Sequence, residues 1–307
     1  MEGKNKNDFK LDFIGIGAAK CATTWVYRCL LEHPQICGPY KKELNFFITK
    51  DPTWGTTNIE HHKYLYNKGI SYYKKYFSHC MTNTVKGEYS VSYFSDPGAA
   101  KLIKKHFPDI KILVCLRDPV KRAYSHYLFA KEFLLLEKSQ TFEEALKNHP
   151  EVYIEWSMYY KQLKNYLDLF PKKNIGIFLI EDLKKNPVIF IQKIYEFLGV
   201  KKDFVPLLAF KKENMAKRTK SQFVKKIMNE IATASVFFKK LRLYFIVDFL
   251  RKLGMENLVV YINNKLNIES FQKSPLSPIT ERYLRDIFRE DVEKLENLLK
   301  RNLSIWK

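Results

Sequence analysis

The sequence has few cysteines, and their arrangement argues against two common stabilising devices. The chain has five, an odd number without a Cys-x-x-Cys pair: Cys21, Cys29, Cys37, Cys80 and Cys115. Disulfide frameworks and structural zinc sites both use paired cysteines, so the pattern argues against each of them. We therefore expect a reducing compartment.

Long apolar runs are also missing. A membrane-spanning helix needs about 18 or more consecutive apolar residues. The longest candidate, Ile231 to Leu250, is interrupted by Lys239, Lys240, Arg242 and Asp248. The first eight residues are polar and lack the hydrophobic segment of a signal peptide. We expect no spanning helix, no leader and a cytoplasmic protein.

Acidic residues are in deficit. The chain has 33 Asp and Glu against 53 Lys and Arg, a net charge of +20. Such a charge attracts anions, including nucleotides, acidic glycans, nucleic acids and lipid surfaces. Because lysines are spread along the whole chain, the excess also fits an ordinary solvated surface. Hydrophobic residues make up 46% of the chain, enough for a sizeable core.

Short apolar segments alternate with segments of helical periodicity up to Gly199. The expected buried strands are Phe13–Gly17, Thr84–Gly87, Lys111–Leu116 and Ile175–Ile180. The expected helices are Thr24–Glu32, Tyr64–Phe77, Ala99–His106, Val120–Phe133, Tyr159–Phe170 and Pro187–Leu198. This alternation predicts an α/β fold with a central, mainly parallel sheet covered by helices on both faces.

The pattern changes after Gly199, a residue typical of a helix end. Residues 205–221 form a polar, basic stretch, and residues 221–252 have the pattern of one or two basic amphipathic helices. A final helix is expected from Ile279 to Arg301. We interpret residues 1–307 as a single domain, with a core near residues 10–200 and helices over residues 221–307.

The first expected strand leads into a loop suited to an anion. Lys20 follows the strand, and Thr23 and Thr24 stand at the start of the next helix. Helix N-termini at the carboxyl edge of a parallel sheet favour phosphate or sulfate. The loop is not a Walker A motif, because Lys20 precedes the small residues and no glycine lies between Ala18 and Thr24. Taken alone, it also fits a simple strand–helix turn.

A second strand end carries a similar set of donors. Arg117 follows the strand that ends at Leu116, and Ser125 comes eight residues later on the expected helix. A guanidinium group and a hydroxyl group both bind phosphate oxygens. A surface ion pair for Arg117 and a solvated Ser125 also fit this segment. Two such loops together predict a ligand with two separated anionic groups.

The two loops together resemble the signature of sulfotransferases that use 3′-phosphoadenosine 5′-phosphosulfate (PAPS), K-x-G-T-T followed by R-[DN]-P-x-x-R-A-Y-S. The resemblance extends, in order along the chain, to Lys42–Phe47, Lys68–Tyr73, Gly87–Tyr93, Glu181–Leu183, Phe197–Val200 and Leu276–Trp306. These segments are most similar to a bacterial branch that resembles heparan-sulfate-type enzymes. The resemblance implies a P-loop-like three-layer fold with a helical C-terminal extension.

The resemblance also implies a reaction and its cofactor. The expected enzyme transfers a sulfuryl group from PAPS to a hydroxyl or amine, without a metal, and leaves adenosine 3′,5′-bisphosphate (PAP). The residues implied for the 5′-phosphosulfate are Lys20, Cys21, Ala22, Thr23, Thr24 and Trp25. Those implied for the 3′-phosphate are Arg117 and Ser125, with Lys217 and Arg218 from a basic loop that closes over it.

Three residues are expected to act in the chemistry. Lys20 is placed to stabilise the leaving group. Glu43, which matches the Glu of the family's K-E-P-H-F-F segment, is the candidate general base. Its alternative is a surface ion pair with Lys41 or Lys42. Glu88, at the end of another strand, would hold the acceptor, orient Lys20 or serve as the base itself.

Three positions depart from the family pattern. Ala22 stands where the family usually has glycine, and we expect a helical or bridging conformation there, since an L residue is strained at positive φ. Asn45 replaces a frequent histidine, and Tyr89 replaces a lysine that holds the acceptor in some heparan enzymes. The acceptor is therefore left open among a glycan, a lipid and a small metabolite.

Other functions remain compatible with parts of the sequence. One alternative is a P-loop-type nucleotide kinase, and another is a non-catalytic polyanion-binding protein. Residues 225–252 would allow peripheral contact with a membrane. We expect no nucleic-acid partner, and the sequence does not predict the oligomeric state.

Overall fold

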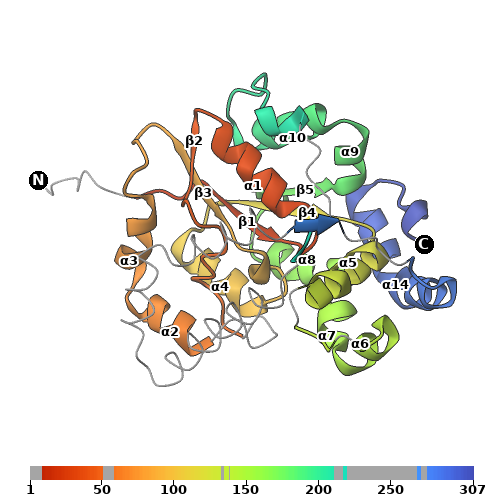
Figure 1. Cartoon of the computed structure of the whole chain (residues 1–307). Coiled ribbons are helices and arrows are strands. Elements are labelled where there is room, and N and C mark those ends of the chain that lie inside the picture. Colours follow the sequence, from red (N-terminus) through yellow and green to blue (C-terminus); the bar gives the residue numbers. More distant parts are fainter. Residues whose placement is uncertain are drawn as a thin grey trace, which may run out of the picture.

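A five-stranded parallel sheet forms the centre of the molecule (Figure 1). The computed structural model describes residues 9–50, 59–132, 135–137, 139–210, 217–219, 268–270 and 275–307. The strands are β1 (Phe13–Gly17), β2 (Ile36–Cys37), β3 (Val85–Tyr89), β4 (Lys111–Leu116) and β5 (Ile175–Leu179). Every residue of β1 is buried, as are the last five of β4, because helices cover both faces of a parallel sheet.

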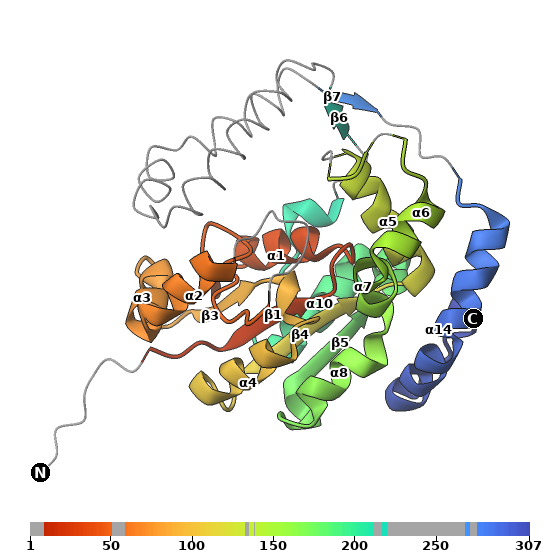
Figure 2. The ribbon, with the colours of Figure 1, turned by 90° about the horizontal axis from the view of Figure 1, so that it is seen from below.

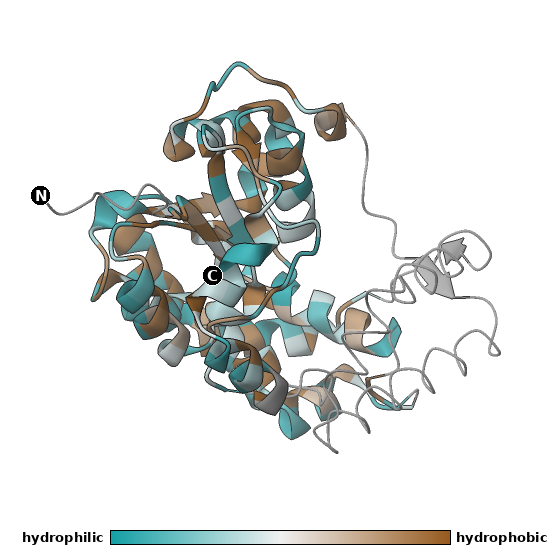
Figure 3. Ribbon diagram, turned by 90° about the vertical axis from the view of Figure 1, so that its left-hand side faces the viewer, coloured by the Kyte–Doolittle hydropathy of each residue, from teal (hydrophilic) through white to brown (hydrophobic). Residues whose placement is uncertain are grey.

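Two layers of helices enclose the sheet (Figures 1 and 2). Helices α1 (Thr23–Glu32) and α10 (Pro187–Leu198) pack together above it in Figure 1, and α4 (Pro97–His106) and α8 (Tyr159–Leu167) pack together below it. The helices around the sheet carry both hydrophobic and hydrophilic residues along their length (Figure 3). In α10 the buried residues follow helical spacing, which gives one apolar face toward the core. The expected three-layer α/β fold is confirmed.

The remaining helices surround this core. They are α2 (Ile59–Asn67), α3 (Ile70–Lys74), α5 (Pro119–Glu132), α6 (Phe142–Asn148), α7 (Pro150–Tyr153), α9 (Ile180–Lys185) and α14 (Pro278–Leu299). A short antiparallel pair joins β6 (Lys217–Thr219) to β7 (Ile268–Ser270). Helix α14 packs on α8 and α5 and agrees with the expected final helix. Within the residues described, no helix combines the length and hydropathy needed to span a bilayer.

The expected elements differ from the observed ones at a few places. The expected helix from Tyr64 to Phe77 is divided into α2 and α3, because Gly69 between them has a φ of 77°. The short strand β2 was not predicted, since two residues carry no periodicity. The amphipathic helices predicted for residues 221–252 lie outside the described residues.

The strand order places two loops next to each other. From β1 the chain builds β2 and β3 on one side of the sheet, then crosses to build β4 and β5 on the other, in the order β2-β3-β1-β4-β5. Ligands in open α/β sheets bind where the strand order reverses, at the carboxyl ends of the strands. Here this point lies between β1 and β4, where the Ala18 amide donates to the Cys115 carbonyl over 2.8 Å.

A disulfide bond joins Cys37, at the end of β2, to Cys80. The expectation from cysteine number and spacing is wrong at this point. Parity and Cys-x-x-Cys spacing say nothing about residues 43 positions apart, and the fold brings their Cα atoms to 5.7 Å. Cys21, Cys29 and Cys115 are free and buried. The disulfide anchors the segment that leads from β2 to Glu43.

Reducing this disulfide is expected to lower the free energy of unfolding by about 4 kcal/mol. In the chain-entropy model, a bond that closes a loop of this length restricts the unfolded chain by that amount. Urea denaturation with and without a phosphine reductant measures the effect. The double variant Cys37→Ser, Cys80→Ser is the control, because its midpoint should not respond to the reductant. Equal midpoints for the wild type under both conditions would contradict the prediction.

Candidate active site

The loop after β1 turns sharply into α1. Lys20 and Ala22 have φ values of 68° and 53°, and Ala22 is the N-cap residue of the helix. The expected helical or bridging conformation of Ala22 is therefore wrong, since the residue is left-handed. The turn from strand to helix imposes this conformation at a cost of roughly 1 kcal/mol for an L residue. No side chain caps the helix at Ala22, so the first amide groups of α1 suit an anion.

The side chains of this loop divide between interior and surface. Cys21 is fully buried, and burial raises the pKa of its thiol to about 11. The Trp25 indole donates to the Leu208 carbonyl over 3.3 Å. Neither side chain is therefore directed to a bound anion, and the Cys21 amide already donates to the Ala18 carbonyl over 3.3 Å. Thr24 is exposed, and the Lys20 ammonium lies 3.9 Å from the centre of the Phe129 ring.

Arg117 extends from the end of β4 toward this loop. Its Nη1 donates to the Lys20 carbonyl over 3.5 Å, so the fold brings the two predicted anion-binding loops into contact. The Nε atom of Arg117 is buried and has no hydrogen-bond partner among the described residues. Ser125 is half-buried on α5, which begins directly after this strand end. Arg117 and Ser125 thus border the same part of the sheet edge as Lys20.

Arg122, on α5, connects the loop after β1 to α7. This arginine is completely buried, and its guanidinium donates to the carbonyls of Ala19 and Val152 and to the Ser157 hydroxyl. His126 lies 2.5 Å from it, and burial together with the positive charge of Arg122 holds the pKa of His126 well below its usual range. A neutral His126 accepts from the guanidinium. The sequence contained Arg122 in its motif, but gave no signal that the residue is buried and fixes Ala19.

Glu43 and Lys42 form a pair beside the start of α1. The Lys42 ammonium contacts a Glu43 oxygen and donates to the Thr23 hydroxyl over 3.2 Å. The other Glu43 oxygen accepts from the Val91 amide over 2.8 Å. The Glu43 side chain is 34% exposed, so the carboxylate is held in place and still reaches solvent. Lys42, which the sequence suggested only as a surface partner of Glu43, links this carboxylate to the anion-binding loop.

Glu88 lies deeper than Glu43. It is 1% exposed and accepts hydrogen bonds from the hydroxyls of Tyr73, Tyr93 and Ser90. The Tyr93 hydroxyl in turn accepts from the Phe46 amide over 2.8 Å, and the Ser90 hydroxyl accepts from the Asn45 amide over 3.0 Å. Glu88 therefore anchors the backbone that follows Glu43.

Glu88 is expected to make the stability of the protein depend on pH. Burial raises the pKa of this carboxyl from 4.5 to about 7. The folded state then holds a proton that the unfolded state has released, so the group's contribution to stability is lost as the pH rises through 7. The Glu88→Gln variant does not titrate. Relative to the wild type it should gain up to about 3 kcal/mol of unfolding free energy between pH 5 and pH 8.

Urea denaturation of both proteins across this pH range measures the difference. The wild-type and Glu88→Gln profiles should converge toward low pH, separate progressively between about pH 5 and pH 7, and run parallel above neutrality. Parallel profiles from pH 5 to pH 8 would show that Glu88 keeps an ordinary pKa.

The predicted contacts of Lys217 and Arg218 with the nucleotide are not tested by the structure. Lys217 and Arg218 belong to β6, whose backbone pairs with Ser270 and Glu269. Their side chains, and residues 211–216, 220 and 221 of the basic stretch 205–221, lie outside the described residues. The assignment of Lys217 and Arg218 to the nucleotide therefore remains a prediction.

Comparison with known proteins gives a consistent result. A family model described as a sulfotransferase domain matches residues 10–242. The chain is 30% identical over 140 residues to the membrane-associated sulfotransferase kil1 of Dictyostelium discoideum, covering 45% of this chain and 26% of that protein. It is 29% identical over 145 residues to human heparan sulfate glucosamine 3-O-sulfotransferase 3B1, covering 45% of this chain and 37% of that enzyme. The chain thus spans well under half of these relatives.

A solved structure extends the similarity over nearly the whole chain. The crystal structure of a sulfotransferase from Alicyclobacillus acidocaldarius superposes with a TM-score of 0.68 at 25% identity. The alignment covers 97% of this chain and 99% of that one. With the matched family model, this similarity confirms the resemblance seen in the sequence motifs. The chain belongs to the sulfotransferase family.

Proposed function

We propose that this protein transfers a sulfuryl group from PAPS to a hydroxyl or amine of an acceptor. The observation that carries the proposal is the contact between the two cationic loops, in which the Arg117 side chain reaches the Lys20 carbonyl. Two separate binding loops meet at the reversal of the strand order, as a nucleotide with two anionic ends requires. Membership in the sulfotransferase family supports the same chemistry.

The residues at this edge fit the proposed nucleotide. The uncapped N-terminus of α1 and Lys20 suit the 5′-phosphosulfate, and Arg117 with Ser125 suits the 3′-phosphate. The buried Nε of Arg117 lacks an acceptor among the described residues, as expected of a guanidinium that still has an anion to bind. Lys217 and Arg218 are proposed to cover the 3′-phosphate.

Bound PAPS would supply the sulfuryl group, and PAP would leave with increased negative charge on its 5′-phosphate. Lys20 and the first amides of α1 would stabilise that charge. Glu43 would take the proton from the acceptor oxygen or nitrogen as the new bond to sulfur forms, and later release it to solvent. Lys42 would hold Glu43 near the loop. We assign Glu88 a supporting role, because its carboxyl is buried and bonded on both oxygens.

The acceptor is proposed to be a glycan, a lipid or a small metabolite. Tyr89, at a position where some heparan enzymes have an acceptor-binding lysine, is fully buried and donates to the Gly17 carbonyl. Tyr89 therefore supports β1 and does not reach an acceptor. The Oδ1 atom of Asn45 is buried and has no hydrogen-bond partner in the described part of the chain, so Asn45 gives no direct evidence of the acceptor.

A thermal-shift experiment tests the proposal. PAP at 100 times its Kd should stabilise the protein by about 2.7 kcal/mol, while ATP with magnesium should have little effect. An equal response to both nucleotides would favour the nucleotide kinase. No response to PAP, with salt-sensitive binding of any polyanion, would favour the non-catalytic alternative. Screening glycans, lipids, alcohols and amines with labelled PAPS would then identify the acceptor.

The cytoplasmic location remains a prediction. It depended on the cysteine pattern and on the polar N-terminal residues, and the Cys37–Cys80 disulfide removes the first of these supports.

A further inference from the structure

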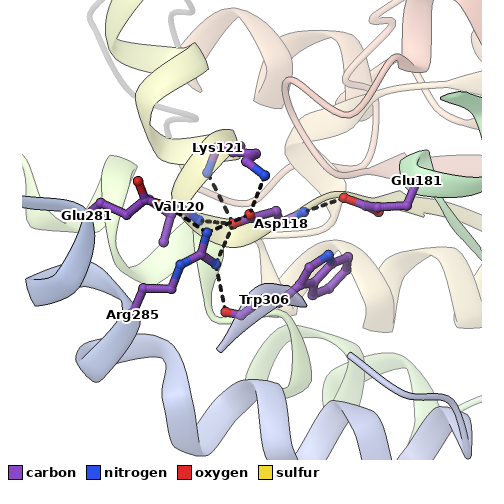
Figure 4. A network of polar contacts seen from close by, with 7 residues as sticks. All are labelled: Asp118, Val120, Lys121, Glu181, Glu281, Arg285 and Trp306. Carbon is purple, nitrogen blue, oxygen red and sulfur yellow. Dashed lines mark hydrogen bonds and ion pairs between the residues drawn. The ribbon is translucent and has the colours of Figure 1, made fainter. Parts of the chain in front are cut away.

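Helix α14 reaches the proposed nucleotide site from a distant part of the sequence. The family model ends at residue 242, whereas α14 covers Pro278–Leu299. One side chain of this helix, Arg285, points to the loop between β4 and α5 and contacts Asp118 there (Figure 4). Asp118 directly follows Arg117, the arginine proposed to bind the 3′-phosphate.

The contact between Arg285 and Asp118 is bidentate. Nη1 of Arg285 donates to Oδ1 over 3.1 Å, and Nη2 donates to Oδ2 over 2.9 Å. The same guanidinium also contacts Glu281 on its own helix and the Trp306 carbonyl. The side chain of Asp118 is 1% exposed and that of Arg285 is 14% exposed. A planar fork in this geometry fixes the direction of the carboxylate as well as its charge.

Asp118 passes this constraint to the start of α5. Its Oδ1 atom accepts from the amides of Val120 and Lys121, so it caps the helix that carries Ser125. Its own amide donates to Glu181 over 3.2 Å (Figure 4). The position of Asp118 therefore determines where the chain leaves β4 and how α5 begins. Arg117 and Ser125, two of the residues proposed to bind the 3′-phosphate, lie on either side of it in the sequence.

We propose that Arg285 is a positioning residue for the 3′-phosphate site, acting through Asp118 on Arg117 and Ser125. The inference rests on the proposed use of PAPS. It makes α14 a part of the nucleotide-binding machinery and not only a cover for α5 and α8. Arg285 does not itself contact the nucleotide in this proposal.

A second arginine of the same segment offers a matched control. Arg301 also makes a bidentate pair, with Asp182 on α9, at 2.5 and 2.7 Å. It attaches the same segment to the core through another element. Removing either arginine therefore loosens this attachment, but only removal of Arg285 takes a bidentate partner from Asp118, which then keeps the Lys121 ammonium and the amides of the α5 N-terminus.

The experiment measures PAP binding to the full chain by calorimetry, for the wild type and the Arg285→Ala, Arg285→Lys and Arg301→Ala variants. Arg285→Ala should raise the Kd for PAP by on the order of tenfold. Arg285→Lys, which keeps the charge without the fork, should fall between. Arg301→Ala should stay near the wild type, although both alanine variants are expected to melt at a lower temperature.

A double-mutant cycle identifies the route of the effect. In an Asp118→Asn background, Arg285→Ala should change the Kd for PAP much less than in the wild type, because the ionised partner is already lost. Equal losses of affinity in Arg285→Ala and Arg301→Ala, or no loss in Arg285→Ala, would overturn the inference while leaving the proposed function intact. A wild type that does not bind PAP would overturn the proposed function and with it the inference.

Discussion

Replacing Lys20 with alanine is expected to lower kcat by a factor on the order of 10² to 10³, the usual cost of removing one charged or hydrogen-bonding group that stabilises a developing anion. Lys20 stands in the turn between β1 and α1, with its carbonyl bound to Arg117. Its ammonium is the side-chain cation of the loop proposed to face the leaving phosphate. The variant removes this charge at the place where negative charge is proposed to increase.

The measurement is transfer of labelled sulfate from PAPS to the acceptor found in the screen, with kcat and KM determined separately. Lys105→Ala, at an exposed position of α4, is the charge-matched control and should keep normal kinetics. Unchanged turnover in Lys20→Ala would remove the lysine from the chemistry. A rise in KM for PAPS without a fall in kcat would restrict Lys20 to donor binding.

The parts of the fold that the sequence predicted are those with local signals. Strands β1 and β4 are continuous apolar runs because both faces of a parallel sheet are covered, and their observed bounds match the prediction. Arg117 and Lys20 were predicted to bind anions because each comes just after a strand. The sequence did not predict the strand order, and it is the observed adjacency of β1 and β4 that brings their loops together.

Contacts between distant segments left no local signal. The Cys37–Cys80 pair, the Lys42–Thr23 contact and the Arg285–Asp118 pair each join residues whose own neighbours give no hint of the partner. Lysines and arginines are abundant in this chain, so a charge alone does not reveal which ones are buried or paired. These contacts depend on how the helices and strands pack together. The sequence predicted most of these elements but not their packing.

The prediction for the backbone conformation of Ala22 was wrong for a different reason. A preference of L residues against positive φ predicted a helical or bridging geometry. The turn that leads from β1 into α1 requires a left-handed residue at the N-cap, and this requirement outweighs the local preference of alanine. Local propensity is a weak guide where the surrounding structure dictates the backbone path.

Replacing Glu43 with glutamine is expected to lower kcat by a factor of roughly 10² to 10⁴, the usual contribution of a general base. Glutamine keeps the size of the side chain, and its carbonyl oxygen retains the hydrogen bond from the Val91 amide. The backbone around residue 43 should therefore persist, whereas the contact with the Lys42 ammonium is lost, because the amide nitrogen that replaces the second oxygen is a donor. The KM for PAPS should change little, since Lys20 and Arg117 are unaltered. What the variant loses is the group proposed to take the acceptor's proton.

Two further variants serve as a control and as a comparison for Glu43→Gln. Glu196→Gln, at an exposed position of α10, is the matched control and should keep normal turnover. Glu88→Gln separates the two carboxylates that the sequence left open as candidates for the base. If Glu43 is the base, its glutamine variant should lose more turnover than that of Glu88, which is 1% exposed and bonded to Tyr73, Tyr93 and Ser90. Near-normal turnover in Glu43→Gln with a severe loss in Glu88→Gln would reverse the two roles, since a buried carboxyl with a pKa near 7 would then be the one that reaches the acceptor.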